Sequence, residues 1–318
     1  MNLINIKSSL QKNFWGRILI KCYHCLYSVP TSYLMLLKYR LFNKSRIEVK
    51  FYTTEELFDM LIVQHKSLTR FGDGEIAWIY KDAKGYFGQE NSDELSRSLK
   101  KVLISERESL LIGIPDFFDG METYSEERKR NREIHLSKYQ EKWRPLINTN
   151  RKYVDALITR VYNGRVNIDY AGLFNQWKQV WNNKKLYVIE GAETKFGVGN
   201  DLLSNASMVK RIVCPAENAF SKYDEILNEA KKHTDAELFL IALGPTASIL
   251  AYDLDCLGYQ AIDIGHLDIE YEWYLKGANT KTPVVGKYVN EAGGAPLLQM
   301  EPGILLKYES EITSKILL

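Results

Sequence analysis

Cysteine is scarce in this sequence of 318 residues, which contains Cys22, Cys25, Cys214 and Cys256. Cys22 and Cys25 form a Cys-x-x-Cys pair, but a structural zinc ion needs four ligands and the sequence offers no second pair. We therefore interpret the pair as two cysteines on one apolar helix face. No secretory signal is recognisable, so the sequence predicts a cytoplasmic protein in a reducing compartment.

Acidic residues are absent from the first 47 positions, and Glu48 is the first carboxylate of the chain. The same segment contains eight bases: Lys7, Lys12, Arg17, Lys21, Lys38, Arg40, Lys44 and Arg46. The whole chain has 42 bases and 40 acids, so removing these eight leaves 34 bases against 40 acids, a net charge of −6. A basic leader on an acidic body predicts a surface-binding arm, and we expect no nucleic-acid partner because no recognised binding motif is present.

The leader also lacks an uncharged apolar run long enough to cross a bilayer. It is nevertheless rich in aromatic and aliphatic side chains, such as Trp15, Tyr23, Tyr33 and Leu34. This composition is typical of a helix in the interface of an anionic membrane, which would make the protein peripheral on the inner face of the plasma membrane. The alternative is that residues 1–50 form a helical extension packed on the main domain or on a second subunit of a homo-oligomer.

We find no internal repeat or low-complexity tract between residues 51 and 292, where strands and helices are expected to alternate. Short β-forming apolar runs predict strands at 68–71, 110–114, 186–189, 211–214, 238–243 and 261–264. Helical periodicity predicts helices at 53–64, 93–105, 125–143, 170–181, 219–232 and 246–257. The alternation indicates an α/β domain with a mostly parallel sheet and helices on both faces, followed by a tail at 293–318.

Unusual residues follow each of the six expected strands. The segments are 70–75, 113–116, 190–201, 214–218, 244–248 and 263–270, and they are rich in Gly, Pro, acids and small hydroxyl side chains. Ligands of open parallel sheets bind beyond the carboxyl ends of the strands. The sequence therefore predicts one binding site at this edge of the sheet.

The turn Gly72-Asp73-Gly74-Glu75 offers two carboxylates one residue apart. Mg²⁺ and Mn²⁺ prefer oxygen ligands and commonly take one or two carboxylates together with a substrate phosphate. Such an ion would offset diphosphate charge, and Arg70 would add a phosphate contact. The alternative is a solvated turn before a helix, whose first turn also favours acids.

Gly191, Gly197 and Gly199 lie in a loop whose amides would approach a phosphate, with Thr194 and Lys195 as side-chain donors. Their spacing matches neither a dinucleotide fingerprint nor a P-loop. The alternative is an ordinary glycine-containing loop between strand and helix. Gly244-Pro245-Thr246 fits a helix start, which would be a phosphate or sugar contact or only a cap.

His266 lies among Asp263, Asp268, Glu270 and Glu272. At the expected edge of the sheet it would be a metal ligand, a general base or a group that orients the acceptor. A single histidine is also commonly structural, and both interpretations stay open.

Short motifs in this order resemble the GT-D-type bacterial glycosyltransferases, over roughly residues 51–292. The motifs are 70–75, Gln89, 113–116, Glu190-Gly191 with 197–202, 214–215 with 218–220, 243–247, 263–273 and 286–291. The resemblance implies a Rossmann-like fold, a UDP-sugar donor and a divalent metal, commonly Mn²⁺. It departs at Thr194-Lys195, where family members often carry Thr-Arg, so bidentate phosphate geometry would be lost.

From these observations together we expect a hexosyltransferase that extends a lipid-linked or protein-linked surface glycan. Asp73 and Glu75, with His266, would hold Mn²⁺ or Mg²⁺, and His266, Asp268 and Glu270 are the candidate proton acceptors. The expected donor-binding residues are Arg70, Gly72, Gln89, Glu190, Gly191, Thr194, Lys195, Gly197, Gly199, Asn200, Asn218, Gly244, Pro245 and Thr246. The rivals are a metal-dependent nucleotide phosphohydrolase and a non-catalytic nucleotide-sugar-binding partner, which would not need an intact acidic pair.

Overall fold

The computed structural model describes residues 18, 22, 26–27, 29–42, 47–83, 88–118, 121–292 and 299–318. Most of the basic leader, including Lys7, Lys12, Arg17, Lys21 and Cys25, and residues 293–298 of the expected tail lie outside the described residues. The expectations that rest on them remain predictions.

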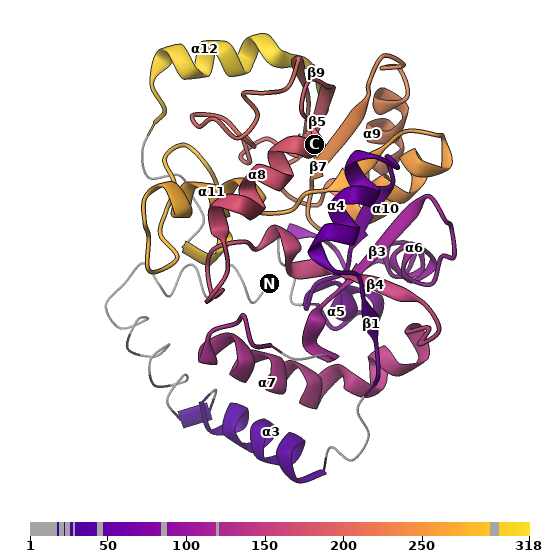
Figure 1. The fold of residues 1–318 in the computed structure, drawn as a ribbon, viewed down its shortest axis with the longest axis vertical. Coiled ribbons are helices and arrows are strands. Elements are labelled where there is room, and N and C mark those ends of the chain that lie inside the picture. The colour runs from indigo at the N-terminus through magenta and orange to yellow at the C-terminus, as the bar shows by residue number, and fades with distance from the viewer. Residues whose placement is uncertain are drawn as a thin grey trace.

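The described chain is built around a nine-stranded sheet in which every pairing is parallel (Figure 1). The strand order is β1-β4-β3-β2-β8-β7-β5-β6-β9. The strands are β1 (Lys50–Phe51), β2 (Ser67–Arg70), β3 (Leu110–Ile114), β4 (Lys152–Asp155), β5 (Lys185–Gly191), β6 (Met208–Cys214), β7 (Leu238–Ala242), β8 (Ala261–Asp263) and β9 (Ile312–Lys315). The parallel α/β architecture expected from the sequence is confirmed, with all six expected strands at its centre.

Three strands were not expected from the sequence, and each has a weak local signal. β1 has two residues, and β4 reads Lys-Tyr-Val-Asp, so neither forms an apolar run. β9 alternates half-buried and exposed residues and pairs in parallel with β6 at the edge of the sheet. The described part of the expected tail therefore joins the sheet through β9, after helix α12 (Pro302–Glu311).

Helices cover both faces because neighbouring strand residues point to opposite sides. Leu186 and Val188 pack under α4 (Thr54–Ile62), α8 (Tyr170–Val180) and α11 (Leu267–Leu275), whereas Tyr187 and Ile189 pack under α9 (Tyr223–Ala230) and α10 (Pro245–Cys256). Near β3, this second face is covered by α5 (Glu75–Ile79), α6 (Asp93–Leu103) and α7 (Glu126–Trp143). The result is a three-layer domain.

Several helices begin at capping residues that can be recognised in the sequence. Thr53 Oγ1 accepts a hydrogen bond from the amide of Glu56 at 3.1 Å, and Glu56 Oε2 accepts one from the amide of Thr53 at 2.8 Å. This reciprocal pair is the expected capping box, and it satisfies two amides that the helix itself leaves free. Ser92, Ser125 and Asp169 cap α6, α7 and α8 in the same side-chain-to-amide manner.

Helix α3 (Val29–Phe42) lies along α7 at the bottom of the molecule, apart from the sheet (Figure 1). Within the described residues, no helix is both long enough and apolar enough to span a bilayer.

Candidate functional site

The carboxyl ends of β3, β2, β8, β7, β5 and β6 lie side by side, because these six strands are consecutive neighbours in a parallel sheet. The six unusual segments identified in the sequence follow these strands. The structure therefore confirms that they meet at one edge of the sheet, as expected for the ligand-binding edge of an open α/β fold.

The acidic turn connects β2 directly to α5. The amide of Gly72 donates a hydrogen bond to Glu75 Oε2 at 2.7 Å, which holds this carboxylate over the turn. A Cβ on Gly72 would lie 3.0 Å from the same oxygen, so glycine leaves room for the contact. Asp73 is exposed and forms no hydrogen bond or ion pair with any residue that the structure describes. One carboxylate is thus fixed by the backbone, and its neighbour is available to a ligand.

The surroundings of Glu75 disfavour its negative charge. Burial, followed by the nearby charges of Asp263 and Asp73, raises the pKa of Glu75 to about 7. A divalent cation would relieve this accumulation of negative charge, and both side chains offer the oxygen ligands that such ions prefer. These two residues fit the metal that the sequence predicted. The described residues contain no group of three His, Cys, Asp or Glu side chains placed to hold a metal ion. His266 is therefore not a third ligand beside Asp73 and Glu75.

Arg70 is bound by the protein itself. Its Nε donates to the carbonyl oxygen of Asp263 at 2.7 Å and its Nη2 to Asp263 Oδ1 at 2.8 Å. Its Nη1 donates to Ala156 O and Thr159 Oγ1. This guanidinium joins β2, β8 and the turn after β4, and it places a positive charge behind the acidic turn.

Glu190 is fully buried at the end of β5. Its Oε1 lies 2.8 Å from Arg211 Nη1, and its Oε2 accepts a hydrogen bond from the amide of Phe196 at 2.6 Å. Arg211 also contacts Glu311 of α12, with Nε and Oε2 2.7 Å apart. Burial raises the pKa of Glu190, and Arg211 opposes that shift. Glu190 therefore anchors the glycine-rich loop to the C-terminal helix.

The glycine-rich loop has several residues in the left-handed region. Gly197 and Gly199 have φ values of +70° and +81°, and Lys195, at +46°, shares this conformation. Lys195 Nζ donates to the carbonyl oxygen of Gly286 at 3.1 Å, and the amide of Thr194 donates to Gly191 O at 2.9 Å. The loop is held by its own turn and by the 286–288 segment.

Asn200, at the end of this loop, meets a buried ionic cluster. Its Nδ2 donates to Asp268 and to Glu272, each at 2.8 Å. Lys287, which has no exposed side-chain surface, lies 2.6 Å from Asp268 and 3.3 Å from Glu272. Both oxygens of Asp268 are occupied in this way, so the structure uses this carboxylate to join the loop, α11 and the 286–288 segment.

Gln89 and Asn218, which were both expected at the site, contact each other. Gln89 Nε2 donates to Asn218 Oδ1 at 2.7 Å, and Gln89 Oε1 accepts from the amide of Phe220 at 3.2 Å. Asn218 is in the left-handed region, with a φ of +49°. The pair links the segment before α6 to the segment after β6, which are 129 positions apart in the sequence.

Helix α10 begins at this edge of the sheet. Gly244 precedes it with φ +55° and ψ −142°, a conformation that essentially only glycine adopts, and Pro245 is the first helical residue. The Oγ1 of Thr246 is buried and has no hydrogen-bond partner. The arrangement offers the amides of a helix start to a ligand, whereas Thr246 has no exposed surface.

His266 and Glu270 lie beside Arg160 and Glu291, which were not among the site residues expected from the sequence. Arg160 contacts Glu291, with Nη2 and Oε1 2.8 Å apart, and approaches Glu270 Oε1 at 3.6 Å. Glu270 Oε2 accepts from the amides of Tyr162 and Asn163. Arg160 follows β4, which has no clear strand signal in the sequence, whereas Glu291 lies in a motif already noted at 286–291.

The Nδ1 of His266 lies 3.7 Å from Glu291 Oε2, and both atoms are buried without a hydrogen-bond partner. Burial, followed by the nearby charge of Arg160, lowers the pKa of His266 to about 4. The imidazole is therefore neutral near pH 7, the form in which it can accept a proton.

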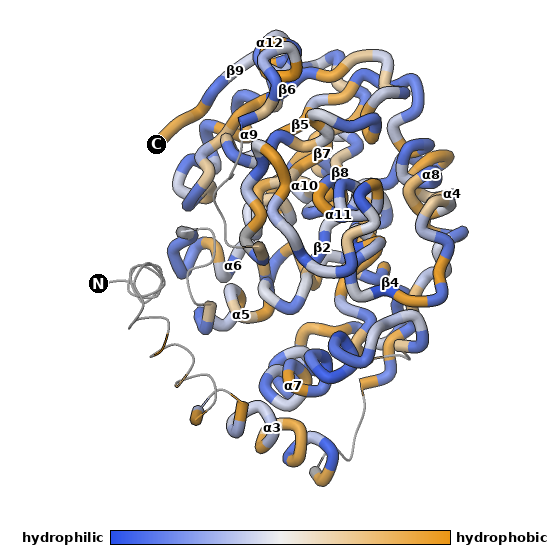
Figure 2. Tube along the Cα trace, turned by 90° about the vertical axis from the view of Figure 1, so that its left-hand side faces the viewer, coloured by the Kyte–Doolittle hydropathy of each residue, from blue (hydrophilic) through white to orange (hydrophobic). Residues whose placement is uncertain are grey.

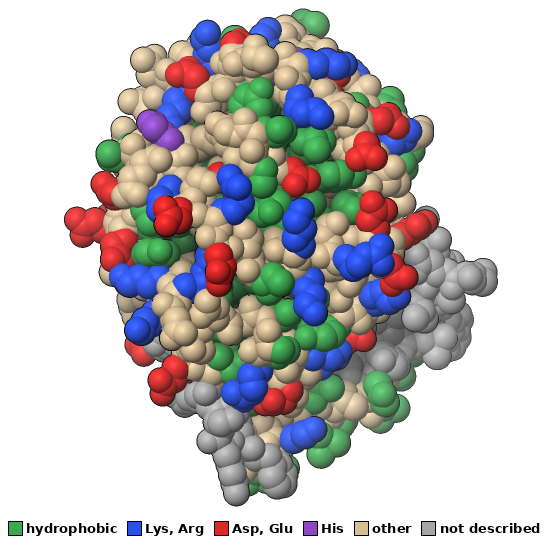
Figure 3. Space-filling view, turned by 90° about the vertical axis from the view of Figure 1, so that its right-hand side faces the viewer, with side chains coloured by type: hydrophobic (Ala, Val, Ile, Leu, Met, Phe, Trp, Pro, Cys, Tyr) green, Lys and Arg blue, Asp and Glu red, His purple; other side chains and the backbone are tan. Residues whose placement is uncertain are grey.

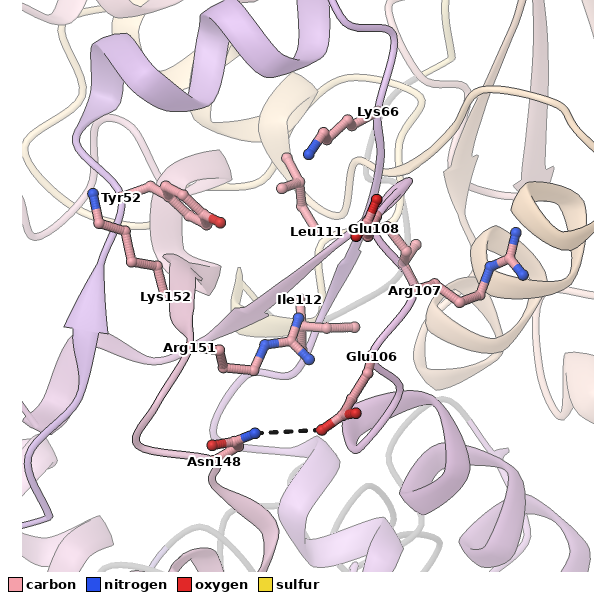
Figure 4. Close-up of a pocket in the computed structure, with 11 residues that line it drawn as sticks. Tyr52, Lys66, Glu106, Arg107, Glu108, Leu111, Ile112, Asn148, Arg151 and Lys152 are labelled. Atoms are coloured by element: carbon pink, nitrogen blue, oxygen red, sulfur yellow. Dashed lines mark hydrogen bonds between the residues drawn. The ribbon is translucent and has the colours of Figure 1, made fainter.

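A cavity of about 350 Å³ lies on the other side of the sheet from the carboxyl ends, near the amino ends of β2, β3 and β4 (Figure 4). The ladder between β3 and β4 is confined to Gly113–Val154 and Ile114–Asp155, so these strands separate toward their amino ends. Lys66, Arg151 and Lys152 line the cavity, and Asn148 donates to Glu106 across its mouth at 3.4 Å. None of the site residues expected from the sequence lines it.

Comparison with known proteins identifies the class. The sequence model of the glycosyltransferase GT-D fold matches residues 68–292. The chain is 37% identical over 253 residues to "Probable glycosyl transferase Gly" of Streptococcus gordonii, covering 77% of this chain and 36% of the relative. It is 35% identical over 239 residues to "Glycosyltransferase GlyD" of Streptococcus pneumoniae serotype 4, covering 74% of this chain and 29% of the relative. The chain thus spans about a third of the length of these relatives.

Solved structures that resemble this chain are also glycosyltransferases or have a glycosyltransferase fold. A new glycosyltransferase from Streptococcus sanguinis superimposes with a TM-score of 0.78 at 33% identity, covering 85% of this chain and 100% of that one. A domain described as having a distinct glycosyltransferase fold gives a TM-score of 0.79 at 33% identity, covering 90% of this chain and 99% of that one. The chain belongs to the GT-D glycosyltransferase family, as the order of its motifs predicted.

Proposed function

We propose that the chain is a metal-dependent glycosyltransferase that transfers a hexose from a UDP-sugar to a bacterial surface glycan or glycoprotein glycan. The supporting observation is the acidic turn at the end of β2, where Glu75 is held by the amide of Gly72 and Asp73 is exposed without a partner among the described residues. Membership of a glycosyltransferase family supports a sugar-transfer reaction over nucleotide hydrolysis.

Asp73 and Glu75 are the residues that would hold Mn²⁺ or Mg²⁺, and the ion would neutralise charge on the departing nucleoside diphosphate. Because no third side chain of the described residues completes the set, its remaining ligands would be donor oxygens and water. Arg70 supports this turn from behind through Asp263 and is a positioning residue in this proposal.

The donor would lie along the carboxyl edge of the sheet. The glycine-rich loop at 191–199 and the start of α10 present amides to its phosphates, and Lys195 adds a positive charge. Gln89 and Asn218 form one wall through their mutual hydrogen bond. Glu190 acts indirectly, because both its oxygens hold the base of the loop.

His266 is the proposed proton acceptor. Both oxygens of Asp268 are bound, by Lys287 and Asn200. Glu270 is fixed by two amides on Oε2, and its Oε1 is buried facing Arg160 at 3.6 Å, so we place neither carboxylate in proton transfer. His266 is neutral and approaches Glu291 through Nδ1, which leaves Nε2 to take the proton of the acceptor hydroxyl. In this arrangement Glu291 would stabilise the imidazolium that forms.

We place this activity in the cytoplasm, since the described cysteines, Cys22, Cys214 and Cys256, are free thiols. The choice of donor sugar and acceptor would depend on the shape of the site at the carboxyl ends of the strands, which differs among proteins that share a fold.

The test is calorimetric binding of UDP to the full chain with and without Mn²⁺. We expect metal-dependent binding that Glu75→Gln loses, because the amide keeps the contact with Gly72 but removes the charge. UDP-sugars are then screened for transfer. Metal-independent UDP binding, or undiminished binding by Glu75→Gln, would reject the metal assignment, whereas absence of UDP binding would reject the donor.

A further inference from the structure

Helix α3 is attached to the domain through one of its faces. Leu36 is 6% exposed, Tyr39 packs beside the cluster of Phe117 and Leu136, and Arg40 contacts Glu133 of α7 at 2.9 Å. In Figure 2, α3 forms the lower margin of the molecule, with α7 between it and the sheet. The helix therefore has an inner face that α7 covers and an outer face that no described element covers.

The outer face is apolar. Leu34, Leu37 and Leu41 have exposed fractions of 66%, 54% and 61%. Their spacing of three and four residues places them on one side of a helix, about 100–160° around its axis from Leu36. Exposed single leucines are ordinary on a protein surface, but a row of them along one helix marks an interaction surface. We call these three residues the outer stripe.

The described charges on α3 are the bases Lys38 and Arg40, and Arg40 is paired with Glu133 of α7. Lys38 is exposed within α3, and the segment from residue 1 to residue 47 contains eight bases and no acid. The face of the domain shown in Figure 3 is different, because acidic and basic side chains are interspersed over it. The segment that contains the outer stripe therefore carries only positive charges in its sequence.

We propose that α3 lies in the interface of an anionic lipid bilayer, with the outer stripe among the acyl chains and Lys38 at the headgroups. An apolar helix face flanked by bases is the pattern of helices that bind such surfaces. The bases of the leader add electrostatic attraction, worth about 1 kcal/mol for each one near the membrane. α3 has 14 residues, too few to cross a bilayer, so it would lie along the surface.

Charge disfavours a second copy of the chain as the occupant. Two copies that paired through the outer stripe would bring together two helices that each carry Lys38 and contain no acid. Repulsion between them is relieved when the partner surface is negative. The proposal is independent of the reaction at the carboxyl edge of the sheet.

The test is co-sedimentation of the full chain with vesicles of phosphatidylcholine alone and of phosphatidylcholine with phosphatidylglycerol. We expect binding to the anionic vesicles that weakens with added salt. The variant Leu34→Gln/Leu37→Gln keeps the net charge and leaves Leu36 in place, and we expect it to bind at least about tenfold more weakly. Leu306→Gln is the matched control, because Leu306 is 73% exposed on α12, at the opposite end of the molecule in Figure 1, and should bind like wild type.

Circular dichroism melts establish that all variants are folded, and light scattering reports their oligomeric state. Binding that is lost in the double variant and kept in Leu306→Gln supports the proposal. Equal binding by the double variant and wild type, or no binding by wild type, overturns it. A wild-type dimer that the double variant dissociates, without vesicle binding, would instead assign the outer stripe to self-association.

Discussion

The ammonium group of Lys287 lies 2.6 Å from Oδ2 of Asp268, and the lysine side chain has no exposed surface. Glu272 approaches the same ammonium at 3.3 Å, and Asn200 binds both carboxylates. Burying three charges is costly unless they are paired and hydrogen-bonded. Their retention at the end of the glycine-rich loop is consistent with a role in fixing its position.

Removal of this lysine should destabilise the protein strongly. Lys287→Met leaves Asp268 and Glu272 buried without their cation, and we expect a loss of about 3–5 kcal/mol in the free energy of unfolding. Urea denaturation measures it. Adding Asp268→Asn should recover part of the loss, because one uncompensated charge disappears. Lys315→Met, which breaks an exposed contact with Glu309, should cost less than about 1 kcal/mol. Similar losses in both lysine variants would contradict this account.

The two carboxylates of the acidic turn should be needed for transfer and not for folding. We expect Asp73→Asn and Glu75→Gln each to lower the transfer rate by about 10²-fold or more, since the charge at the departing diphosphate would no longer be balanced. Product formation from UDP-sugar and thermal melts measure activity and folding. Glu55→Gln changes an exposed carboxylate on α4 and should leave both unchanged. Normal turnover by both acidic-turn variants would remove the turn from the mechanism.

Two glycines with the same backbone conformation should respond differently to alanine. Gly265 and Gly277 have φ values of +52° and +58°, so each substitution introduces backbone strain of about 1 kcal/mol. A Cβ on Gly265 would lie 2.0 Å from Arg70 Nη2, whereas one on Gly277 would meet nothing within 4 Å. We therefore expect Gly265→Ala to displace Arg70 from Asp263 and lose activity. Gly277→Ala should lose only stability, and equal activities in the two variants would refute this explanation.

Stability should fall in mild acid, partly through His135. Its Nε2 accepts a hydrogen bond from Trp143 Nε1 at 3.0 Å, and burial lowers its pKa to about 4 from a usual value of 6.5. Between these values the unfolded chain binds a proton that the folded protein does not, so stability decreases as the pH falls. At pH 5 this contribution is about 1–2 kcal/mol. Urea denaturation at pH 7.5 and pH 5 should show a smaller difference for His135→Gln, and an unchanged difference would exclude His135 as the cause.

The local sequence was sufficient to predict the central strands and their common edge. Apolar runs at 110–114 and 238–243 cannot form amphipathic surface strands, so they belong inside a sheet covered on both faces. Parallel strands then place their carboxyl ends together, which is why the segments at 70–75 and 190–201 could be expected to meet. Strands β1, β4 and β9, which lie at or next to the two margins of the sheet, were not predicted because their pairing depends on neighbours that are distant in the sequence.

The polar residues at the site could also be identified from the sequence. Which of them are free for a ligand and which are bound within the protein was decided only by the tertiary structure. Asp73 and Asp268 are alike as residues, yet Asp73 is exposed and Asp268 is enclosed by Lys287 and Asn200. Arg160 reaches Glu291 across 131 positions of sequence. The charge state and freedom of a side chain depend on burial and on the partners that folding brings within hydrogen-bonding distance, and residue type and spacing do not specify either.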